Sequence, residues 1–217
     1  MKAAHFFLLI LFFECSAHAA TPVKNPPLFW PEGKFIPIQV SYQQALADGL
    51  EFTITEFANS ELPLYSPSMR DWKQTDKLTY RKSSVAFANN RNPAIKAGIA
   101  MVKSNDWLQS LDKDALNQYV ASLRLQYPKR FVLKNVDTDF SPVPGSGFLI
   151  GKPYKMVHYQ IVSEHNPNAV IEIRDFITQI NDLTLVMSFE SPSGLASHNS
   201  RMALTMLTSL SKLDDLE

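Results

Sequence analysis

Histidine and carboxylate side chains are the groups of this chain that could hold a metal ion. His158 and His165 lie seven residues apart, with Glu164 beside the second histidine. If His158 lies in a strand and His165 at its end, this odd spacing places them on opposite faces. A metal site needs two or three ligands that converge on one point. We therefore interpret residues 165–167 as a solvated turn, and we expect no metal site.

Serines beside glycine are the second pattern that could carry chemistry. Ser146 stands directly between two glycines, which departs from the G-x-S-x-G elbow of hydrolases, so residues 141–147 are predicted to form a flexible loop. Ser193, His198 and Asp175 supply the three residue types of a catalytic triad. Their spacing gives no support, because triads are recognised by geometry. A hydrolase with a Ser/His/carboxylate site stays open as an alternative.

The remaining carboxylates are scattered along the chain. Asp137 and Asp139 alternate, which would place both on one face of a strand as a weak cation or acid–base site, but we favour capping or solvation. The chain contains no phosphate-binding loop, dinucleotide fingerprint or calcium loop. Its basic residues are dispersed and its formal net charge is zero, so we expect no cofactor and no nucleic acid.

The first nineteen residues have the pattern of an export signal. Lys2 provides the positive charge, residues 6–13 (FFLLILFF) are continuously apolar, and Ala17 and Ala19 form an A-x-A cleavage site. The apolar run is far shorter than the roughly 20 residues that span a bilayer. We expect export to the periplasm or beyond the cell, cleavage before residue 20, and no transmembrane segment afterwards.

The chain's only cysteine, Cys15, lies inside this signal. Phe13 and Glu14 stand where a lipoprotein signal needs small residues, so lipidation is the disfavoured alternative. The mature chain would then contain no disulfide, thiolate nucleophile or cysteine-bound zinc.

Residues 20–49 form a proline-rich leader, followed by a single domain at 50–217. Prolines deny helix to most of the leader, which nevertheless contains Phe29 and Trp30. We expect a tail that packs along the domain surface, with an exposed aromatic contact for a partner as the sharper alternative. Trp30, Phe29 and Trp72 are the candidate binding residues, although tryptophans pack in cores more often than they contact partners.

The patterns along the chain predict an α+β fold. Alternating residues predict strands at 36–40 and 50–55, further strands at 78–81, 85–88 and 95–102, and a short helical turn at 42–47. Apolar residues at steps of three and four predict a long helix over 110–127, capped by Ser110 or Asp112 and ended by Pro128. Further strands are predicted at 131–136 and 148–150. Three closely spaced strands at 155–162, 170–177 and 183–189 predict an antiparallel meander, and a helix is expected over 193–213.

This order of elements resembles the Mog1/PsbP-like fold of PsbP-like and DcrB-like exported proteins, over about residues 50–213. The likeness rests on a Pro-then-Trp segment at 65–72, a hairpin at 85–102, a helix running into a strand at 111–132, and the terminal strand and helix at 183–189 and 202–210. The resemblance implies an antiparallel sheet with a long central helix and a C-terminal helix packed on it. It also implies partner binding or an envelope role, mostly without catalysis.

Together these patterns indicate an exported, non-enzymatic accessory protein that binds a protein partner. A carrier of an apolar ligand or lipid is the other alternative, and it would need a cavity between sheet and helix.

Overall fold

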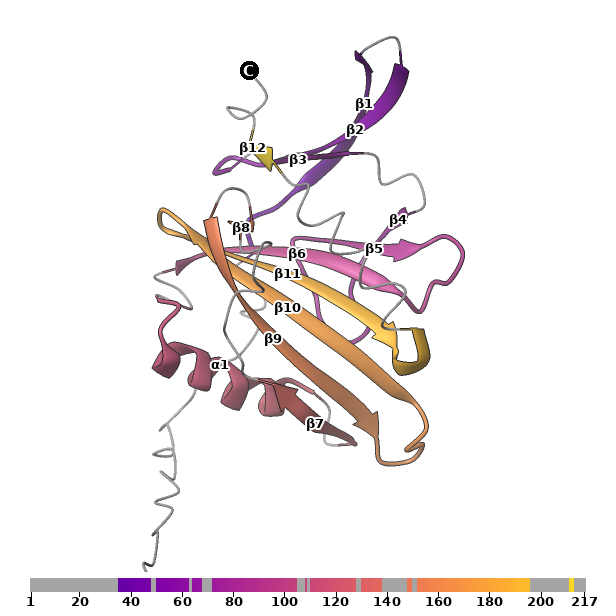
Figure 1. Cartoon of the computed structure of the whole chain (residues 1–217), viewed down its shortest axis with the longest axis vertical. Coiled ribbons are helices and arrows are strands. Elements are labelled where there is room, and N and C mark those ends of the chain that lie inside the picture. The colour runs from indigo at the N-terminus through magenta and orange to yellow at the C-terminus, as the bar shows by residue number, and fades with distance from the viewer. Residues whose placement is uncertain are drawn as a thin grey trace, which may run out of the picture.

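Two antiparallel sheets and one α-helix make up most of the described part of the molecule (Figure 1). The computed structural model describes residues 35–47, 50–62, 64–67, 72–104, 108, 110–127, 130–137, 148–149, 152–195 and 211–212. The 4-stranded sheet has the order β1-β2-β3-β12, and the 8-stranded sheet has the order β4-β5-β6-β11-β10-β9-β7, with β8 paired to β9. In these ranges no helix is long and apolar enough to cross a membrane.

The small sheet is built from the start of the described chain and closed by its end. Its strands are β1 (Gln39–Ala47), β2 (Leu50–Ala58), β3 (Leu64–Pro67) and β12 (Ser211–Lys212). β1 and β2 pair residue for residue from Gln39↔Ala58 to Ala47↔Leu50 and extend away from the large sheet as an arm (Figure 1).

The large sheet holds the predicted hairpin and meander. Its strands are β4 (Trp72–Thr75), β5 (Val85–Asn89), β6 (Lys96–Lys103), β7 (Phe131–Asp137), β8 (Phe148–Leu149), β9 (Lys152–Ser163), β10 (Val170–Ile180) and β11 (Leu183–Pro192). The turn between β10 and β11 places Asn181 at φ 55°, a left-handed conformation that asparagine tolerates. Continuous registers in β9–β10–β11 confirm the antiparallel meander.

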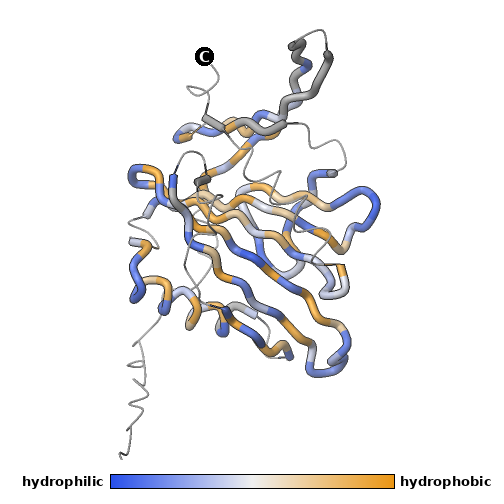
Figure 2. The backbone as a smooth tube through the Cα atoms, viewed as in Figure 1, coloured by the Kyte–Doolittle hydropathy of each residue, from blue (hydrophilic) through white to orange (hydrophobic). Residues whose placement is uncertain are grey.

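The helix α1 (Lys113–Gln126) confirms the predicted amphipathic segment. Asp112 caps it by accepting a 2.8 Å hydrogen bond from the Ala115 amide, and Tyr127, which precedes Pro128, returns to extended backbone. Hydrophobic and hydrophilic residues alternate along α1 and along the long strands (Figure 2). The apolar side of α1 is buried against β9, β10 and β11.

The two faces of the large sheet are covered by different elements. Leu116, Tyr119 and Leu123 of α1 pack on one face, against Tyr159 and Ile177. Residues of the small sheet and of the leader's end pack on the other, where the Phe57 and Phe87 rings meet edge to face at 6.0 Å. Alternating side chains along each strand therefore belong to two separate cores.

The predicted helical turn at 42–47 and strand at 78–81 are wrong. Residues 42–47 belong to β1, because pairing with β2 satisfies their backbone and overrides the local helix propensity of a Gln-Ala-Leu sequence. Residues 78–81 form an irregular segment that crosses the helix-covered face of the sheet.

The predicted C-terminal helix is not present in the described part of the chain. Ser193–Leu195 forms a 3-10 turn, and β12 pairs with β3, so the end of the predicted range is strand. The rest of that range, 196–210, lies outside the described residues. The described part of the chain is thus a mainly antiparallel sheet structure with one long helix.

Gly98 makes room for the irregular segment that crosses the sheet. A Cβ atom at this position would lie 3.0 Å from Leu78 Cδ2 and 3.2 Å from Ser83 Oγ. Leu78 is fully buried, so it has little freedom to move away. The absence of a side chain at Gly98 therefore sets how closely residues 78–83 approach β6.

We expect Gly98→Val to lower the free energy of unfolding by about 1–3 kcal/mol, because the added atoms overpack Leu78. Gly194→Ala is the matched control, since a Cβ at Gly194 would meet nothing within 4 Å. Urea unfolding of both variants measures the difference. Equal stability of the two variants would show that the crossing segment can shift.

Candidate functional site

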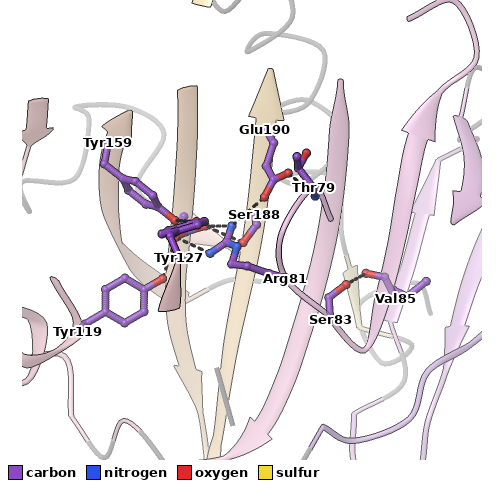
Figure 3. Close-up of polar contacts among 10 residues, drawn as sticks. Thr79, Arg81, Ser83, Val85, Tyr119, Tyr127, Tyr159, Ser188 and Glu190 are labelled. Atoms are coloured by element: carbon purple, nitrogen blue, oxygen red, sulfur yellow. Dashed lines mark hydrogen bonds and ion pairs between the residues drawn. The ribbon is translucent and has the colours of Figure 1, made fainter. Parts of the chain in front are cut away.

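Within the described ranges, a set of titratable and hydroxyl side chains lies between α1 and the large sheet, around a buried ion pair. The Arg81 guanidinium donates two parallel hydrogen bonds to Asp175, from Nη1 to Oδ2 and from Nη2 to Oδ1, each 3.0 Å long (Figure 3). Both side chains have no exposed surface. This bidentate geometry is the strongest form of an arginine–carboxylate contact.

Three segments bring these groups together. Asp175 of β10 stands opposite Ser188 of β11, which in turn stands opposite Gly98 of β6. The irregular segment crosses the sheet at Gly98, and from it Arg81 reaches toward Asp175. The cluster therefore depends on a residue without a side chain in the neighbouring strand.

Hydroxyl groups complete the coordination of the carboxylate. Asp175 also accepts hydrogen bonds from Tyr119 Oη at 2.9 Å, Tyr159 Oη at 3.0 Å and Ser188 Oγ at 2.6 Å. With the two bonds from Arg81, these donors fill the roughly four acceptor sites of a carboxylate. Tyr127 joins the cluster through a 2.9 Å bond between its hydroxyl and that of Tyr159.

A second carboxylate binds the same segment. Glu190 of β11 lies 3.5 Å from Arg81 Nη2 and accepts a 2.8 Å hydrogen bond from the Thr79 amide. Its side chain is 1% exposed. We refer to Arg81, Asp175, Glu190, Ser188 and the three tyrosines as the buried polar cluster.

Electrostatics keep Arg81 charged and the phenols neutral. Burial lowers the pKa of Arg81, whereas the nearby carboxylates, Asp175 foremost, raise it. The rise outweighs the effect of burial, so the pKa of Arg81 lies well above its ordinary value. Burial raises the pKa of Tyr119, Tyr127 and Tyr159, and the positive charge of Arg81 only partly offsets that rise. Each tyrosine therefore acts as a neutral hydrogen-bond donor at physiological pH.

This arrangement is suited to holding the fold rather than to catalysis. A catalytic group must touch its substrate, and Arg81, Tyr159 and Asp175 are at most 2% exposed. Asp175 already receives five donors and has no lone pair directed at solvent.

A smaller polar group occupies the opposite face of the sheet. Glu172 accepts hydrogen bonds from Ser193 Oγ at 2.9 Å and Gln160 Nε2 at 3.3 Å, and its Oε2 lies 3.3 Å from His158 Nε2. Burial raises the pKa of Glu172, but these hydrogen bonds outweigh it and lower the pKa overall.

The position of this second group is relevant to the catalytic triad of Ser193, His198 and Asp175 that was considered from the sequence. Glu172 and Asp175 are three residues apart in β10, so their side chains point to opposite faces. Ser193, which bonds Glu172, is therefore separated from Asp175 by the sheet. His198 and the predicted loop at 141–147 lie outside the described residues, as does Asp139.

No group of three metal-binding side chains occurs within the described ranges. His158 is committed to Glu172, and His165 is exposed in a bend beyond the end of β9. Asp137 ends β7 and is exposed.

The candidate binding residues fall in two places. Trp72 begins β4, is 8% exposed and packs in the core beneath the small sheet. Its burial favours a packing role, while its role in binding stays a prediction. Phe29 and Trp30 lie outside the described residues, as does Trp107.

The part of the leader just before β1 is fixed to the large sheet. The Ile36 amide donates a 2.9 Å hydrogen bond to the Met101 carbonyl, and Ile38 is 7% exposed in the core. The leader then continues into β1, so its last part belongs to the arm.

The residues of the buried polar cluster were missed in the sequence, apart from Asp175. A signal for Asp175 was present, because the row of β10 that faces α1 reads Ile171, Ile173, Asp175 and Ile177. One carboxylate in an apolar row predicts a buried partner. No comparable signal marks Arg81, which lies in a segment without periodicity.

Comparison with solved structures identifies the fold. The cyanobacterial PsbP protein CyanoP from Synechocystis sp. PCC 6803 matches with a TM-score of 0.52 and 9% identity, over 76% of this chain and 96% of that one. This match confirms the predicted Mog1/PsbP-like fold, and at this identity it shows the fold alone.

Two further structures match more loosely. LpqN, involved in cell envelope biogenesis of Mycobacterium tuberculosis, has a TM-score of 0.45 and 11% identity, over 81% of this chain and 91% of that one. The Saccharomyces cerevisiae Ran-binding protein Mog1p has a TM-score of 0.38 and 10% identity, over 79% and 95%. No protein-family model matches the chain, and no curated protein matches it by sequence.

We expect Arg81→Met and Asp175→Asn each to lower the free energy of unfolding by about 3–5 kcal/mol, because each leaves an uncompensated buried charge. The double variant should lose much less than the sum of the two. Lys103→Met is the matched control: this partly exposed lysine also contacts two carboxylates, Glu61 and Asp182, and its loss should cost at most about 1 kcal/mol. Additive losses in urea unfolding would contradict a coupled pair.

We also expect stability to fall steeply above about pH 10, the ordinary pKa of tyrosine. The unfolded chain then releases phenol protons that Tyr119, Tyr127 and Tyr159 retain in the fold, so each contributes a loss of about 1.4 kcal/mol per pH unit. Ultraviolet titration should show these three phenols ionising only with unfolding. Their ionisation in the folded protein would contradict the described burial.

Proposed function

We propose that this chain is an exported, non-enzymatic accessory module that binds a protein partner in the cell envelope. The observation that carries the proposal is the burial of the polar cluster. The side chains best equipped for chemistry are sealed inside and bonded to one another. Among the described elements, the arm formed by β1 and β2 extends away from the large sheet, where a partner could reach it (Figure 1).

The N-terminal pattern supports the location. A charged start, an apolar run at 6–13 and alanines at 17 and 19 are typical of a cleaved signal. Cleavage would remove Cys15, leaving a mature chain without thiols for an oxidising compartment. The fold resemblance also supports the proposal, since it implies partner binding or an envelope role.

The leader supports a contact role for Phe29 and Trp30. Ile36 and Ile38 fix the end of the leader to the sheet, so the two aromatic residues lie a short stretch of chain before an anchored point. Aromatic residues near an anchored point serve well as contacts, because tryptophan contributes a large apolar area with few rotatable bonds.

We expect Trp30→Ala to leave the melting temperature unchanged and to lower the yield of a cross-linked adduct with an envelope protein. The variant is isolated from the exported fraction, where mass spectrometry checks that the mature chain begins at residue 20. Trp72→Ala is the matched control, because removing this buried ring should lower stability by about 3–5 kcal/mol.

A large loss of melting temperature in Trp30→Ala would assign this residue to the core instead. Retention of the uncleaved chain in the cytoplasm would contradict export.

A further inference from the structure

The four sheet edges of the described chain differ in how they are protected against pairing. β4 has only four residues and includes Lys73, and β12 has only two and includes Lys212. β7 includes Lys134, and its register with β9 shifts between Lys134 and Asp137. Short length, lysine and a bulge are the devices by which proteins block pairing at an exposed edge.

β1 has none of these devices. It is nine residues long, its register with β2 has no shift, and its sequence QVSYQQALA contains neither charge nor proline. On the side away from β2, no strand of the described chain pairs with it. Tyr42 in its middle is 54% exposed, the highest value among the described large hydrophobic residues.

The chain around this edge is negatively charged. Between Lys34 and Arg70 there is no lysine, arginine or histidine, and the acidic residues of that stretch are Asp48, Glu51, Glu56 and Glu61. Glu61 pairs with Lys103 of the large sheet at 2.7 Å. Glu56 of β2 accepts a 2.8 Å hydrogen bond from Ser41 of β1.

We propose that β1 docks an extended, positively charged segment of the partner protein as an added strand of the small sheet. The added strand takes up the outward backbone groups of β1, in the manner of β-strand addition. Its lysine or arginine side chains lie along the acidic hairpin, which supplies the charge complementarity. This inference rests on the proposed function, because it specifies what the partner presents.

Two other occupants fit the edge less well. A second copy of the chain would bring two acidic hairpins together, and like charges disfavour that pairing. The leader of the same chain contains Pro22, Pro26, Pro27 and Pro31, and each proline lacks the amide that a strand ladder needs.

The test uses a labelled, end-blocked peptide as long as β1, with the repeating order Lys-Thr-Val-Thr, and measures its binding to the purified protein by fluorescence anisotropy. One control peptide has the same sequence with N-methylated backbone amides, and another has glutamate in place of lysine. We expect both controls to bind roughly tenfold more weakly or worse.

Two matched protein variants locate the site. Tyr42→Lys places a charge on β1, and Val132→Lys places one on β7, where Val132 is 40% exposed. Both positions are on the surface, so both variants should fold. We expect Tyr42→Lys to weaken binding of the basic peptide by roughly tenfold and Val132→Lys to leave it unchanged.

Three results would overturn the inference. Equal binding of the N-methylated peptide would show attraction by charge without strand addition. Loss of binding only in Val132→Lys would place the site on β7. A dimer in analytical ultracentrifugation that Tyr42→Lys dissociates would make a second copy the occupant.

The cross-linking experiment separates this inference from the proposed function. If the Tyr42→Lys variant still forms the envelope adduct at full yield, the partner exists but does not use β1. If no variant and no original protein forms an adduct, the proposed function itself fails.

Discussion

The ion pair between Arg81 and Asp175 is the interaction on which the rest of the structure depends. It joins an irregular segment to the centre of the large sheet, and through Tyr119 it also joins α1. A buried pair of this kind is costly to desolvate, and it becomes favourable only when every remaining polar site is satisfied. Tyr119, Tyr159 and Ser188 meet that condition for Asp175, so helix, sheet and crossing segment must assemble together.

This requirement explains why the two faces of the large sheet are built so differently. The face under the small sheet is held by apolar contacts such as Phe57 against Phe87, which tolerate rearrangement. The face under α1 includes directional bonds, which fix the position of the crossing segment above Gly98. The larger of the two polar groups described for the sheet therefore lies on the helix side, away from the arm.

The contrast also separates what the sequence could predict from what it could not. α1 and the β9–β10–β11 meander can be predicted from local periodicity and turn residues, because these signals lie within the segments themselves. The burial of Arg81 depends on a segment without periodicity and on space left by a glycine in another strand. The helical states predicted for 42–47 and for the end of 193–213 are wrong, because the strand state of β1 and β12 comes from pairing with β2 and β3 and not from local propensity.

The candidate binding edge of β1 is related to the burial of the polar cluster. Because the titratable side chains of the buried polar cluster bind one another inside the molecule, they are not available to a partner. We therefore assign partner recognition to the backbone groups and the charge of the small sheet. An edge strand ordinarily endangers a protein through unwanted pairing, and the short, lysine-bearing or bulged edges β4, β7 and β12 show that this chain limits that danger elsewhere. The acidic residues around β1 make its pairing selective by repelling a second copy while attracting a basic strand. An edge left open in this way is consistent with a binding role, since only a partner of opposite charge offsets the cost of ordering a strand against it.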